Sequence, residues 1–388
     1  MSAHSPSIQP VPMVSAAEVL GRKDVRIIDL RSPSEFADDH LPGAVNVPLF
    51  GDLQRSLVGF LYQQVSPAEA FDQGKQFAAE GVQGLVEKVA QVVSWPLPKG
   101  DFAEHVERIC GVGLHDLEQS LQPQALNACP DAAVVLHCWR GGLRSRSVVS
   151  LLRWLGLTRA VGLQGGYKAY RRQVMLGLER WNRPHPVVLR GLTGVGKTLV
   201  LREIERQRPG STLDLEGLAG HRSSMLGMVG LKPCSQKRFD SRLHRALGAP
   251  GASTLIVEGE SRKVGDVVLP KALWQAMCGG RSLWLEASED HRVKVLMDDY
   301  LGAGGDRETL RRQLVALAPR LSSELELVEL FDRREEQELV RRLLRHYYDP
   351  LYLHSEENHI YLETFDASDV EAAASGILDW LDASEGGA

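Results

Sequence analysis

The most restrictive feature of the sequence is a glycine-rich segment in its second half, Gly191-Leu-Thr-Gly-Val-Gly-Lys-Thr. It matches the pattern G-x-x-x-x-G-K-[ST] at every position, and it lies between a strand-like segment, residues 187–190, and a helical one, residues 198–207. In this motif backbone N–H groups surround phosphate oxygens, the lysine reaches the terminal phosphate and the hydroxyl binds Mg²⁺. A chance glycine-rich turn is the alternative. The predicted phosphate-binding residues are Gly191, Thr193, Gly194, Gly196, Lys197 and Thr198, with Thr198 as the candidate Mg²⁺ ligand.

Length and pattern together predict an α/β protein with more than one domain. The chain has 388 residues, and its 43% hydrophobic content lets each domain bury a core. Strand-like and helical segments alternate in both halves, which is typical of parallel sheets. We expect a parallel-sheet domain over residues 14–180 with a helical insertion at about 51–125, and a P-loop NTPase-like α/β domain over residues 186–388 with a helical segment at about 306–346. Residues 1–13 are expected to form a loose, proline-containing tail.

The cysteines and the lack of apolar runs indicate the cellular compartment. The chain has 5 cysteines and no CxxC pair, which argues against a disulfide framework and against a structural zinc site. A reducing cytoplasm fits this usage. No apolar run approaches the ~18 residues of a membrane span, and the first residues do not resemble a signal peptide. We therefore expect a cytoplasmic protein without a membrane partner.

One cysteine lies in a second glycine-rich loop. The segment Cys138-Trp-Arg-Gly-Gly-Leu-Arg-Ser falls between a predicted strand, residues 133–137, and a predicted helix, residues 144–155. Backbone N–H groups at such a position stabilise a thiolate or the terminal anion of a persulfide. Two nearby arginines add positive charge, so we expect a lowered pKa and a reactive thiol; a buried structural cysteine is the alternative. The predicted site comprises Cys138 as the catalytic thiol and Trp139, Arg140, Gly141, Gly142 and Arg144 as its loop.

Polar residues beyond the phosphate loop form a further set of candidates. Glu258 ends a predicted strand, where P-loop proteins place an acidic residue that holds the metal; a surface carboxylate is the alternative. Residues 213–224 form a charged, glycine-containing stretch that is either a site or an ordinary turn. Arg292 is interpreted as an exposed helix charge rather than a phosphate contact. The predicted set is Asp214, Glu216, His221, Arg222, Glu258 and Arg262.

Positive charge is concentrated between the two loops in the sequence, although the formal net charge is −5. Residues 138–206 contain 14 Lys and Arg residues against 3 Asp and Glu residues. Such an excess is typical of a surface that binds a polyanion. Trp139 and Tyr167 are candidate surfaces for stacking bases, with packing in the core as the alternative. The candidate nucleic-acid contacts are Arg146, Lys168, Arg171 and Arg172.

The first half resembles rhodanese domains at four segments in the right order. These are Asp29-Leu-Arg-Ser-Pro-Ser-Glu-Phe, then His40-Leu-Pro-Gly-Ala-Val-Asn-Val-Pro, the loop that begins at Cys138, and Gly165-Gly-Tyr. The resemblance implies that Cys138 carries sulfur or selenium as a persulfide or perselenide. The distance from His40 to Cys138 is longer than in a plain rhodanese domain, so the insertion points to a substrate other than thiosulfate.

Rhodanese segments followed by a phosphate loop resemble the bacterial tRNA 2-selenouridine synthases over nearly the whole chain. The second half carries that family's strings Asp214-Leu-Glu-Gly-Leu-Ala-Gly-His-Arg-Ser-Ser, Val257-Glu-Gly-Glu-Ser-Arg-Lys-Val-Gly and Tyr347-Tyr-Asp-Pro-Leu-Tyr. We expect the last of these to end a long helix at Pro350. The resemblance implies a tRNA substrate with 2-thiouridine at the wobble position.

The same resemblance implies two reactions. Geranyl diphosphate first alkylates the thiocarbonyl sulfur, and selenium from selenophosphate then replaces the S-geranyl group. No permanent cofactor is implied, Mg²⁺ is a candidate ion, and an enzyme that supplies selenophosphate is a candidate partner. Two other interpretations stay open: a rhodanese-type sulfurtransferase fused to an ATPase or kinase, and a non-enzymatic nucleotide-binding module that senses redox state through Cys138. The concentration of positive charge favours the tRNA substrate over both.

Overall fold

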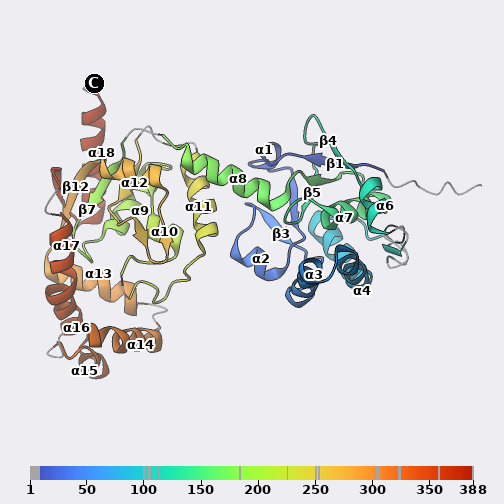
Figure 1. Ribbon diagram of the computed structural model, residues 1–388. Helices are drawn as coiled ribbons and strands as arrows, with labels where there is room; N and C mark the ends of the chain where they lie inside the picture. Colours follow the sequence, from blue (N-terminus) through green and yellow to red (C-terminus); the bar gives the residue numbers. More distant parts are fainter. Residues whose placement is uncertain are drawn as a thin grey trace, which may run out of the picture. The chain divides into compact units, whose positions relative to one another are not determined.

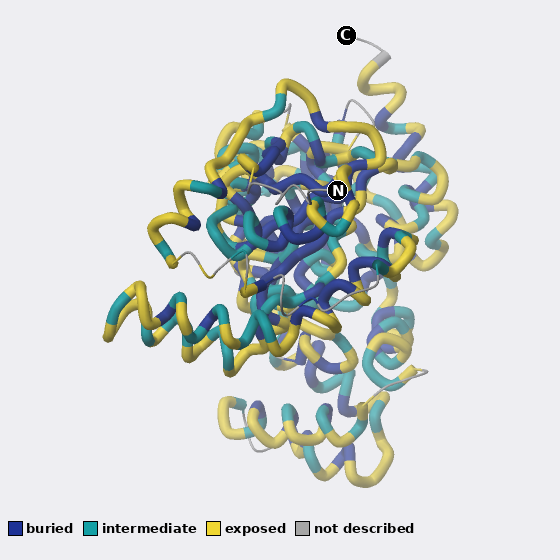
Figure 2. The backbone as a smooth tube through the Cα atoms, turned by 90° about the vertical axis from the view of Figure 1, so that its right-hand side faces the viewer, coloured by how far each residue is buried: buried dark blue, intermediate teal, exposed yellow. Residues whose placement is uncertain are grey.

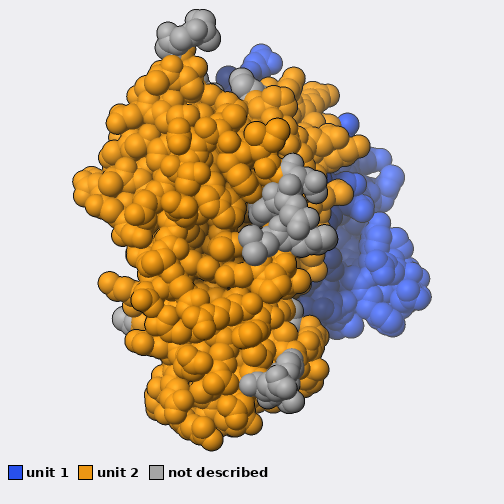
Figure 3. All heavy atoms as spheres, turned by 90° about the vertical axis from the view of Figure 1, so that its left-hand side faces the viewer, with its two compact units in different colours: residues 1–175 blue, residues 176–388 orange. Residues whose placement is uncertain are grey.

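The computed structural model describes residues 9–98, 102, 106–107, 109, 111, 113–182, 185–224, 226–249, 251, 254–302, 306–321, 325–356 and 359–386. The chain divides into two compact units, Met1–Met175 and Leu176–Ala388, which Figure 3 shows in separate colours. Each unit has its own sheet and its own core (Figure 1). Within the described residues no helix combines the length and the hydropathy that a membrane crossing requires.

The first unit is built on a six-stranded sheet in the order β3-β2-β5-β6-β1-β4, and every strand pair in it is parallel. Strands β1, β5 and β6 are buried along their whole length, as expected for parallel strands covered on both faces. The strands are β1 (Val11–Val14), β2 (Arg26–Asp29), β3 (Ala44–Asn46), β4 (Pro123–Ala125), β5 (Val134–His137) and β6 (Ala160–Leu163). The expectation of a loose tail was therefore wrong for residues 11–13, which lie inside the sheet.

Helices cover this sheet and form the segment between β3 and β4. Ser66 caps the longest of them by accepting a hydrogen bond from the Glu69 N–H, and Pro67 occupies its first turn, where no intrahelical acceptor is lost. The helices are α1 (Ala16–Val19), α2 (Pro33–Asp38), α3 (Asp52–Gln64), α4 (Pro67–Val93), α6 (Leu114–Ser120), α7 (Leu143–Trp154) and α8 (Gly166–Glu179). Figure 2 shows how buried and exposed residues alternate along the helices.

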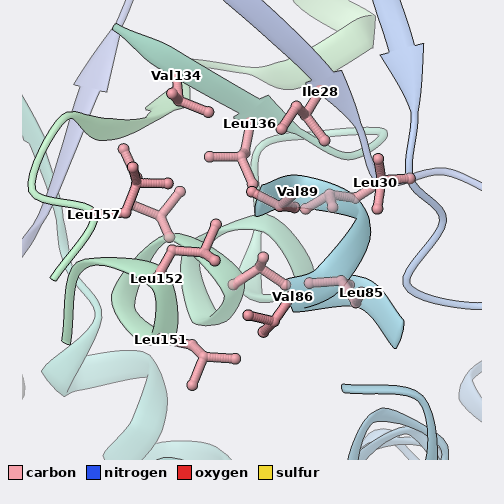
Figure 4. Packing of buried hydrophobic residues seen from close by; sticks show 14 of the residues in the cluster. Ile28, Leu30, Leu85, Val86, Val89, Val134, Leu136, Leu151, Leu152 and Leu157 are labelled. Carbon is pink, nitrogen blue, oxygen red and sulfur yellow. The ribbon is translucent and has the colours of Figure 1, made fainter. Parts of the chain in front are cut away.

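The core of the first unit lies between the sheet and helices α4 and α7. Val86 and Val89 of α4 and Leu152 of α7 point toward Ile28 and Leu136 of the strands (Figure 4). All five side chains are fully buried, and burying each stabilises the fold by roughly 1.5–3 kcal/mol. Part of the inserted segment is thus anchored in the core of this unit.

The second unit is built on a five-stranded parallel sheet in the order β13-β12-β7-β9-β8, with a separate hairpin of β10 and β11. Strand β7 lies at the centre, which places the phosphate loop at the middle of the sheet's carboxyl edge, the usual binding edge of such sheets. The strands are β7 (Val187–Arg190), β8 (Thr212–Leu213), β9 (Ile256–Glu258), β10 (Lys263–Val264), β11 (Val267–Val268), β12 (Arg281–Glu286) and β13 (Tyr361–Asp366).

Helices of the second unit cover its sheet and build a separate helical cluster near the chain's end. That cluster has its own core, centred on Leu314, Leu330 and Leu344. The helices are α9 (Lys197–Gln207), α10 (Leu215–Ala219), α11 (Gln236–Gly248), α12 (Lys271–Cys278), α13 (Glu289–Leu301), α14 (Arg307–Leu317), α15 (Leu327–Asp332), α16 (Glu336–Leu343), α17 (Asp349–Glu356) and α18 (Val370–Gly386). The predicted fold class, two α/β sheet domains followed by a helical region, is confirmed.

The expected helix end at Pro350 was wrong. A π-helical turn, Leu344–Tyr348, leads directly from α16 into α17. Pro350 is the second residue of α17. In the first turn of a helix the missing N–H of a proline removes little of the helix's own hydrogen bonding. The proline thus accompanies a change of helix geometry, and π-helical turns often lie at functional sites.

Candidate functional site

The cysteine loop is positioned by strand β5 and helix α7. Cys138 follows β5 directly, and the loop then turns sharply at Gly141, whose φ is +65°. A Cβ at Gly141 would lie 2.6 Å from the Leu163 carbonyl oxygen and 3.1 Å from the Gly165 nitrogen, so only glycine fits. The Tyr167 N–H donates to the Cys138 carbonyl at 3.0 Å. The last two rhodanese-like segments of the sequence are therefore packed against each other.

The Cys138 thiol is buried but electrostatically favourable to a negative charge. It is 2% exposed, and its Sγ lies 3.3 Å from the Ser145 Oγ. Burial by itself raises the thiol pKa, but the charge of Arg144 and hydrogen bonds from Ser145 and from the Arg140 backbone outweigh it, so the pKa of Cys138 is lowered. A thiolate-favouring cysteine at the start of a helix has the properties of a nucleophile.

Residues of the rhodanese-like segment that begins at Asp29, together with Asp39, contact Tyr167 next to the cysteine loop. Arg31 is 1% exposed, pairs with Asp29 at 2.6 Å and donates to the Asp39 carbonyl at 2.7 Å. Its guanidinium lies 3.7 Å from the centre of the Tyr167 ring, whose hydroxyl donates to the Asp39 carboxylate at 2.9 Å. Tyr167 is therefore a core residue, and of the two proposed stacking surfaces only Trp139, which is half-buried, stays accessible.

A large pocket opens beside the thiol. Its volume is about 680 Å³, and its wall combines the cysteine loop with side chains of α3 and α4 from the inserted segment. Apolar residues predominate away from the loop. The principal lining residues are Leu49, Phe50, Val58, Tyr62, Ala70, Phe71, Gly74, Ala78, Leu114 and Leu143, together with Cys138, Trp139, Arg140 and Arg144. Sequence reasoning identified the inserted helices but not this pocket.

The four candidate nucleic-acid contacts fall into two pairs. Arg146 donates to the Leu121 carbonyl at 2.7 Å, and Arg171 lies 3.9 Å from the Asp39 carboxylate. Both arginines are thus used within the unit. Lys168 and Arg172 are exposed and lie four residues apart on one face of α8. These two keep the properties that a phosphate contact needs.

The phosphate loop has the backbone geometry that its glycines predict. Gly191, Gly194 and Gly196 have φ values of +151°, +79° and +96°. A Cβ at Gly191 would lie 2.5 Å from the Leu285 carbonyl oxygen, which no larger residue tolerates. Lys197 donates to the Gly191 carbonyl at 3.0 Å, so its ammonium lies across the loop. The loop therefore presents backbone N–H groups and a lysine at the N-terminus of α9, where anions are stabilised.

Buried carboxylates stand behind this loop. Glu258 is fully buried, accepts a hydrogen bond from Thr198 Oγ1 at 3.2 Å and accepts another from the Glu216 N–H at 2.8 Å. Burial, followed by the charges of Glu216 and Glu260, raises the pKa of Glu258 well above its usual value. Burial and Glu260 likewise raise the pKa of Glu216 to about 7. The burial of Glu258 excludes the alternative of a surface carboxylate, and its position beside Thr198 fits the predicted metal-associated role.

Arg292 was also misassigned as an exposed charge. It is 6% exposed, and its Nε donates to the Thr193 carbonyl of the phosphate loop at 2.9 Å. The same guanidinium forms a two-pronged ion pair with Asp349. Tyr352, one turn further along α17, has its ring 5.6 Å from the Lys197 ammonium. Asp349 and Tyr352 of the Tyr347-Tyr-Asp-Pro-Leu-Tyr string thus lie beside the phosphate loop, just after the π-helical turn that joins α16 to α17.

The other predicted residues of this unit lie at the edge of the site or outside it. Asp214 caps α10 by accepting from the Gly217 N–H at 2.6 Å. Arg222 donates to the carbonyls of Val229 and Asp299, both at 2.8 Å, so its charge serves the fold. His221 packs against Gly265, where a Cβ would approach its ring to 2.4 Å. Arg262 is exposed just before β10.

The donor set beside the phosphate loop suits Mg²⁺. Hydroxyl and carboxylate oxygens, here from Thr198 and Glu258, are the ligands this ion takes together with diphosphate oxygens. Among the described residues no group of three or more His, Cys, Asp or Glu side chains is arranged to hold a metal alone. The ion would therefore depend on oxygens of a bound diphosphate.

The remaining cysteines do not share the environment of Cys138. Burial raises the pKa of Cys129 and of Cys234, which disfavours their thiolates. Cys278 is exposed at the end of α12. Cys110 lies outside the described residues.

Fold and sites together define a class of enzyme that joins a rhodanese-like unit to a phosphate-loop unit. Known proteins agree: the rhodanese-like domain model matches residues 14–78, and the tRNA 2-selenouridine synthase AAA domain model matches residues 184–326. The tRNA 2-selenouridine synthase of Cupriavidus pinatubonensis is 32% identical, with 92% of this chain and 94% of the relative covered. The chain belongs to the tRNA 2-selenouridine synthase family.

Further relatives support this assignment. The synthase of Pseudomonas syringae pv. syringae is 32% identical over 86% of this chain and 89% of its own length. That of Chromohalobacter salexigens is 30% identical over 91% and 94%. The N-terminal domain of a Clostridium difficile 630 protein described as ATP/GTP binding aligns with 42% of this chain and 98% of its own at 25% identity. Its TM-score of 0.31 is too low to support an argument.

Proposed function

We propose that this enzyme converts 2-thiouridine at the wobble position of tRNA to 2-selenouridine through an S-geranyl intermediate. The observation that carries the proposal is the presence, in one family member, of a thiolate-favouring cysteine loop and a complete phosphate loop. Geranyl diphosphate and selenophosphate are the proposed co-substrates. Each contains an anionic phosphorus group, and each loop is built to hold an anion.

In the first step the thiocarbonyl sulfur displaces diphosphate from the first carbon of geranyl diphosphate. A carbon–sulfur bond forms, the carbon–oxygen bond breaks and pyrophosphate leaves. Backbone N–H groups of the phosphate loop and Lys197 stabilise the charge that develops on the departing pyrophosphate. Mg²⁺, held by Thr198 and through water by Glu258, would supply further neutralisation.

In the second step selenium from selenophosphate bonds to C2 of the uracil. The C2–sulfur bond then breaks, and the S-geranyl group leaves as a thiolate that takes up a proton. Hydrolysis of the phosphorus–selenium bond releases phosphate, so the exchange needs no oxidant or reductant. We assign to Cys138 and its loop the task of positioning the selenium of the donor next to C2, with no bond formed to the thiol, and to Arg140 and Arg144 the task of holding the phosphate of the donor.

The substrate and its supply follow from the same chemistry. Lys168 and Arg172 on α8 are the proposed contacts to the tRNA backbone, and Trp139 is a surface on which an unpaired base can stack. A cytoplasmic location is proposed because it suits a tRNA substrate, and an enzyme that makes selenophosphate is the proposed upstream partner.

One incubation tests the proposal. The protein is mixed with tRNA that contains 2-thiouridine, with geranyl diphosphate, selenophosphate and Mg²⁺, and the nucleosides are identified by mass. We expect S-geranyl-2-thiouridine without selenophosphate and 2-selenouridine with it. Absence of both nucleosides would remove the proposal. Steady ATP hydrolysis or thiosulfate-dependent sulfur transfer in their place would favour a sulfurtransferase fused to an ATPase.

A further inference from the structure

The pocket beside Cys138 is far larger than a selenium or sulfur donor requires. Selenophosphate and thiosulfate are small anions, whereas this cavity of about 680 Å³ lies in the range of sites that enclose drug-sized ligands of about 300–1,000 Å³. The thiol itself is 2% exposed and borders this cavity. The molecule that reacts at Cys138 therefore has room for a sizeable group next to its reacting atom.

The character of the wall changes along the pocket. Arg140 and Arg144 line it at the cysteine loop, where an anion is to be held. Away from the loop apolar side chains predominate in the wall, among them Phe50, Val58 and Phe71. Polar side chains also line it there, namely Arg55, Gln63, Lys75 and Glu118. An anionic donor gains nothing from such a surface, since burying a charge against apolar groups is unfavourable. A ligand that is polar at one end and a hydrocarbon at the other matches both parts.

Two features of the inserted helices keep this apolar space open. Helix α3 has no buried residue, although it is rich in apolar ones, so its Val58 faces the pocket instead of a packed core. On α4 the buried Gly74 lacks a side chain where a Cβ would meet Phe50 at 3.5 Å and Val58 at 4.0 Å. Both distances are ordinary van der Waals contacts, so a Cβ fits at this position. Atoms beyond the Cβ are expected to take up space beside Phe50 and Val58, which line the cavity.

We propose that this pocket is the binding site of the geranyl chain during selenium transfer. The inference rests on the function proposed above and adds to it the site and a role for the inserted helices. The chain of the S-geranyl uridine lies between α3 and α4, which brings C2 of the uracil to Cys138. When the C2–sulfur bond breaks, the geranylthiolate leaves into the apolar pocket and takes up a proton. Burial of the hydrocarbon favours the alkylated tRNA over unalkylated 2-thiouridine at this thiol.

Protection of the thiol tests the pocket without any tRNA. Iodoacetamide labels Cys138 in the full-length protein, and the rate is followed by mass with geraniol or with allyl alcohol present. We expect geraniol to slow labelling at least about tenfold and allyl alcohol to have little effect, because each buried CH₂ changes affinity by roughly fourfold. In Gly74→Leu geraniol should give no protection. Gly81→Leu is the matched control, since Gly81 is exposed on the same helix with no atom within 4 Å of its Cβ position.

A second arm measures selenation of tRNA that carries either S-geranyl- or S-methyl-2-thiouridine. The ratio of the two rates should fall roughly 10- to 100-fold in Gly74→Leu and stay at the wild-type value in Gly81→Leu. A labelling rate that geraniol does not change, or an unaltered ratio in Gly74→Leu, would overturn the pocket assignment. The two proposals can fail separately. If 2-selenouridine forms but geraniol does not protect Cys138 from labelling, only the pocket assignment is contradicted. If geraniol protects Cys138 but no 2-selenouridine forms, the proposed function is contradicted.

Discussion

The cysteine loop and the phosphate loop have the same architecture and opposite electrostatics. Each follows a parallel strand, begins a helix and turns at a glycine in the left-handed region, Gly141 in one and Gly194 in the other. In the cysteine loop the pKa of the Cys138 thiol is lowered, so this loop favours the thiolate anion of its own cysteine. Around Lys197 the carboxyls of Glu216 and Glu258 have raised pKa values, so they favour the neutral form until a cation arrives. Similar backbone geometry thus surrounds a thiol with a lowered pKa in one loop and lies beside carboxyls with raised pKa values in the other.

Removing the thiol should have the largest effect. Cys138→Ala removes the thiol that is proposed to position the selenium, and losses of a catalytic group reduce rates by roughly 10³-fold or more. We expect selenation of tRNA with preformed S-geranyl-2-thiouridine to fall by that factor, measured as 2-selenouridine formed per minute. Cys278→Ala, which removes an exposed cysteine, should match the wild-type protein. Selenation at the wild-type rate in Cys138→Ala would show that the thiol takes no part.

Removing the lysine should act on the other step. Lys197→Ala deletes a charge that stabilises pyrophosphate, and losses of this kind reduce rates by roughly 10²–10³-fold. We expect geranylation of 2-thiouridine tRNA to fall by that factor in a single-turnover assay with geranyl diphosphate. Lys271→Ala, at an exposed lysine that begins α12, is the control. If geranylation survived in Lys197→Ala, the phosphate loop would have a different ligand.

The buried carboxyls make a prediction about stability and pH. The pKa of Glu216 is about 7 in the folded protein, whereas an unperturbed glutamate has a pKa of 4.5. Between these two pH values the folded state therefore holds a proton that the unfolded state loses. This contribution to stability is complete below pH 4.5 and falls as the pH rises to 7, by up to about 3 kcal/mol. Glu216→Gln cannot lose that proton.

The measurement is the melting temperature of the second unit's transition at several pH values, without Mg²⁺ or diphosphate. Between pH 5 and pH 8 (about the window set by that raised pKa) the wild-type value should fall further than that of Glu216→Gln. Glu308→Gln, at an exposed position of α14, should behave as wild type. Parallel curves for all three proteins would contradict the raised pKa.

The smallest effect is expected on the surface. Lys168→Ala combined with Arg172→Ala removes two exposed charges, and each lost phosphate contact should lower the slope of log affinity against log salt by roughly 0.7–0.9. The measurement is tRNA binding at several salt concentrations. Lys88→Ala, on the exposed face of α4, should leave the slope unchanged. An unchanged slope in the double variant would place the tRNA elsewhere.

Sequence reasoning located the two loops, each between a strand and a helix, because both are encoded locally. The phosphate loop and the cysteine loop each consist of neighbouring residues with strict backbone requirements, so their glycines and flanking strands identify them. It failed where partners are distant. Arg292 and Asp349 are 57 residues apart, and nothing local in either segment shows that they meet beneath the phosphate loop. Strand β1 was missed because it has only four residues, contains Pro12 and follows Pro10, so it resembles a tail.

The inserted helices show the same limit. Apolar periodicity predicts helices in residues 51–93, but it does not say that Val58 and Gly74 leave a cavity between them. A cavity forms where the side chains of facing helices do not fill the space between them. Which side chains face one another is decided only when the whole unit is assembled. The long spacing between His40 and Cys138 was nevertheless the signal of an insertion, from which we predicted a substrate other than thiosulfate.

The division of labour between the two loops is tested most directly by finding where each variant stops. Cys138→Ala and Lys197→Ala are each given 2-thiouridine tRNA with geranyl diphosphate and selenophosphate, and the nucleosides are separated by mass. We predict that Cys138→Ala accumulates S-geranyl-2-thiouridine, whereas Lys197→Ala retains 2-thiouridine. If both variants stopped at the same nucleoside, the assignment of one step to each loop would be contradicted.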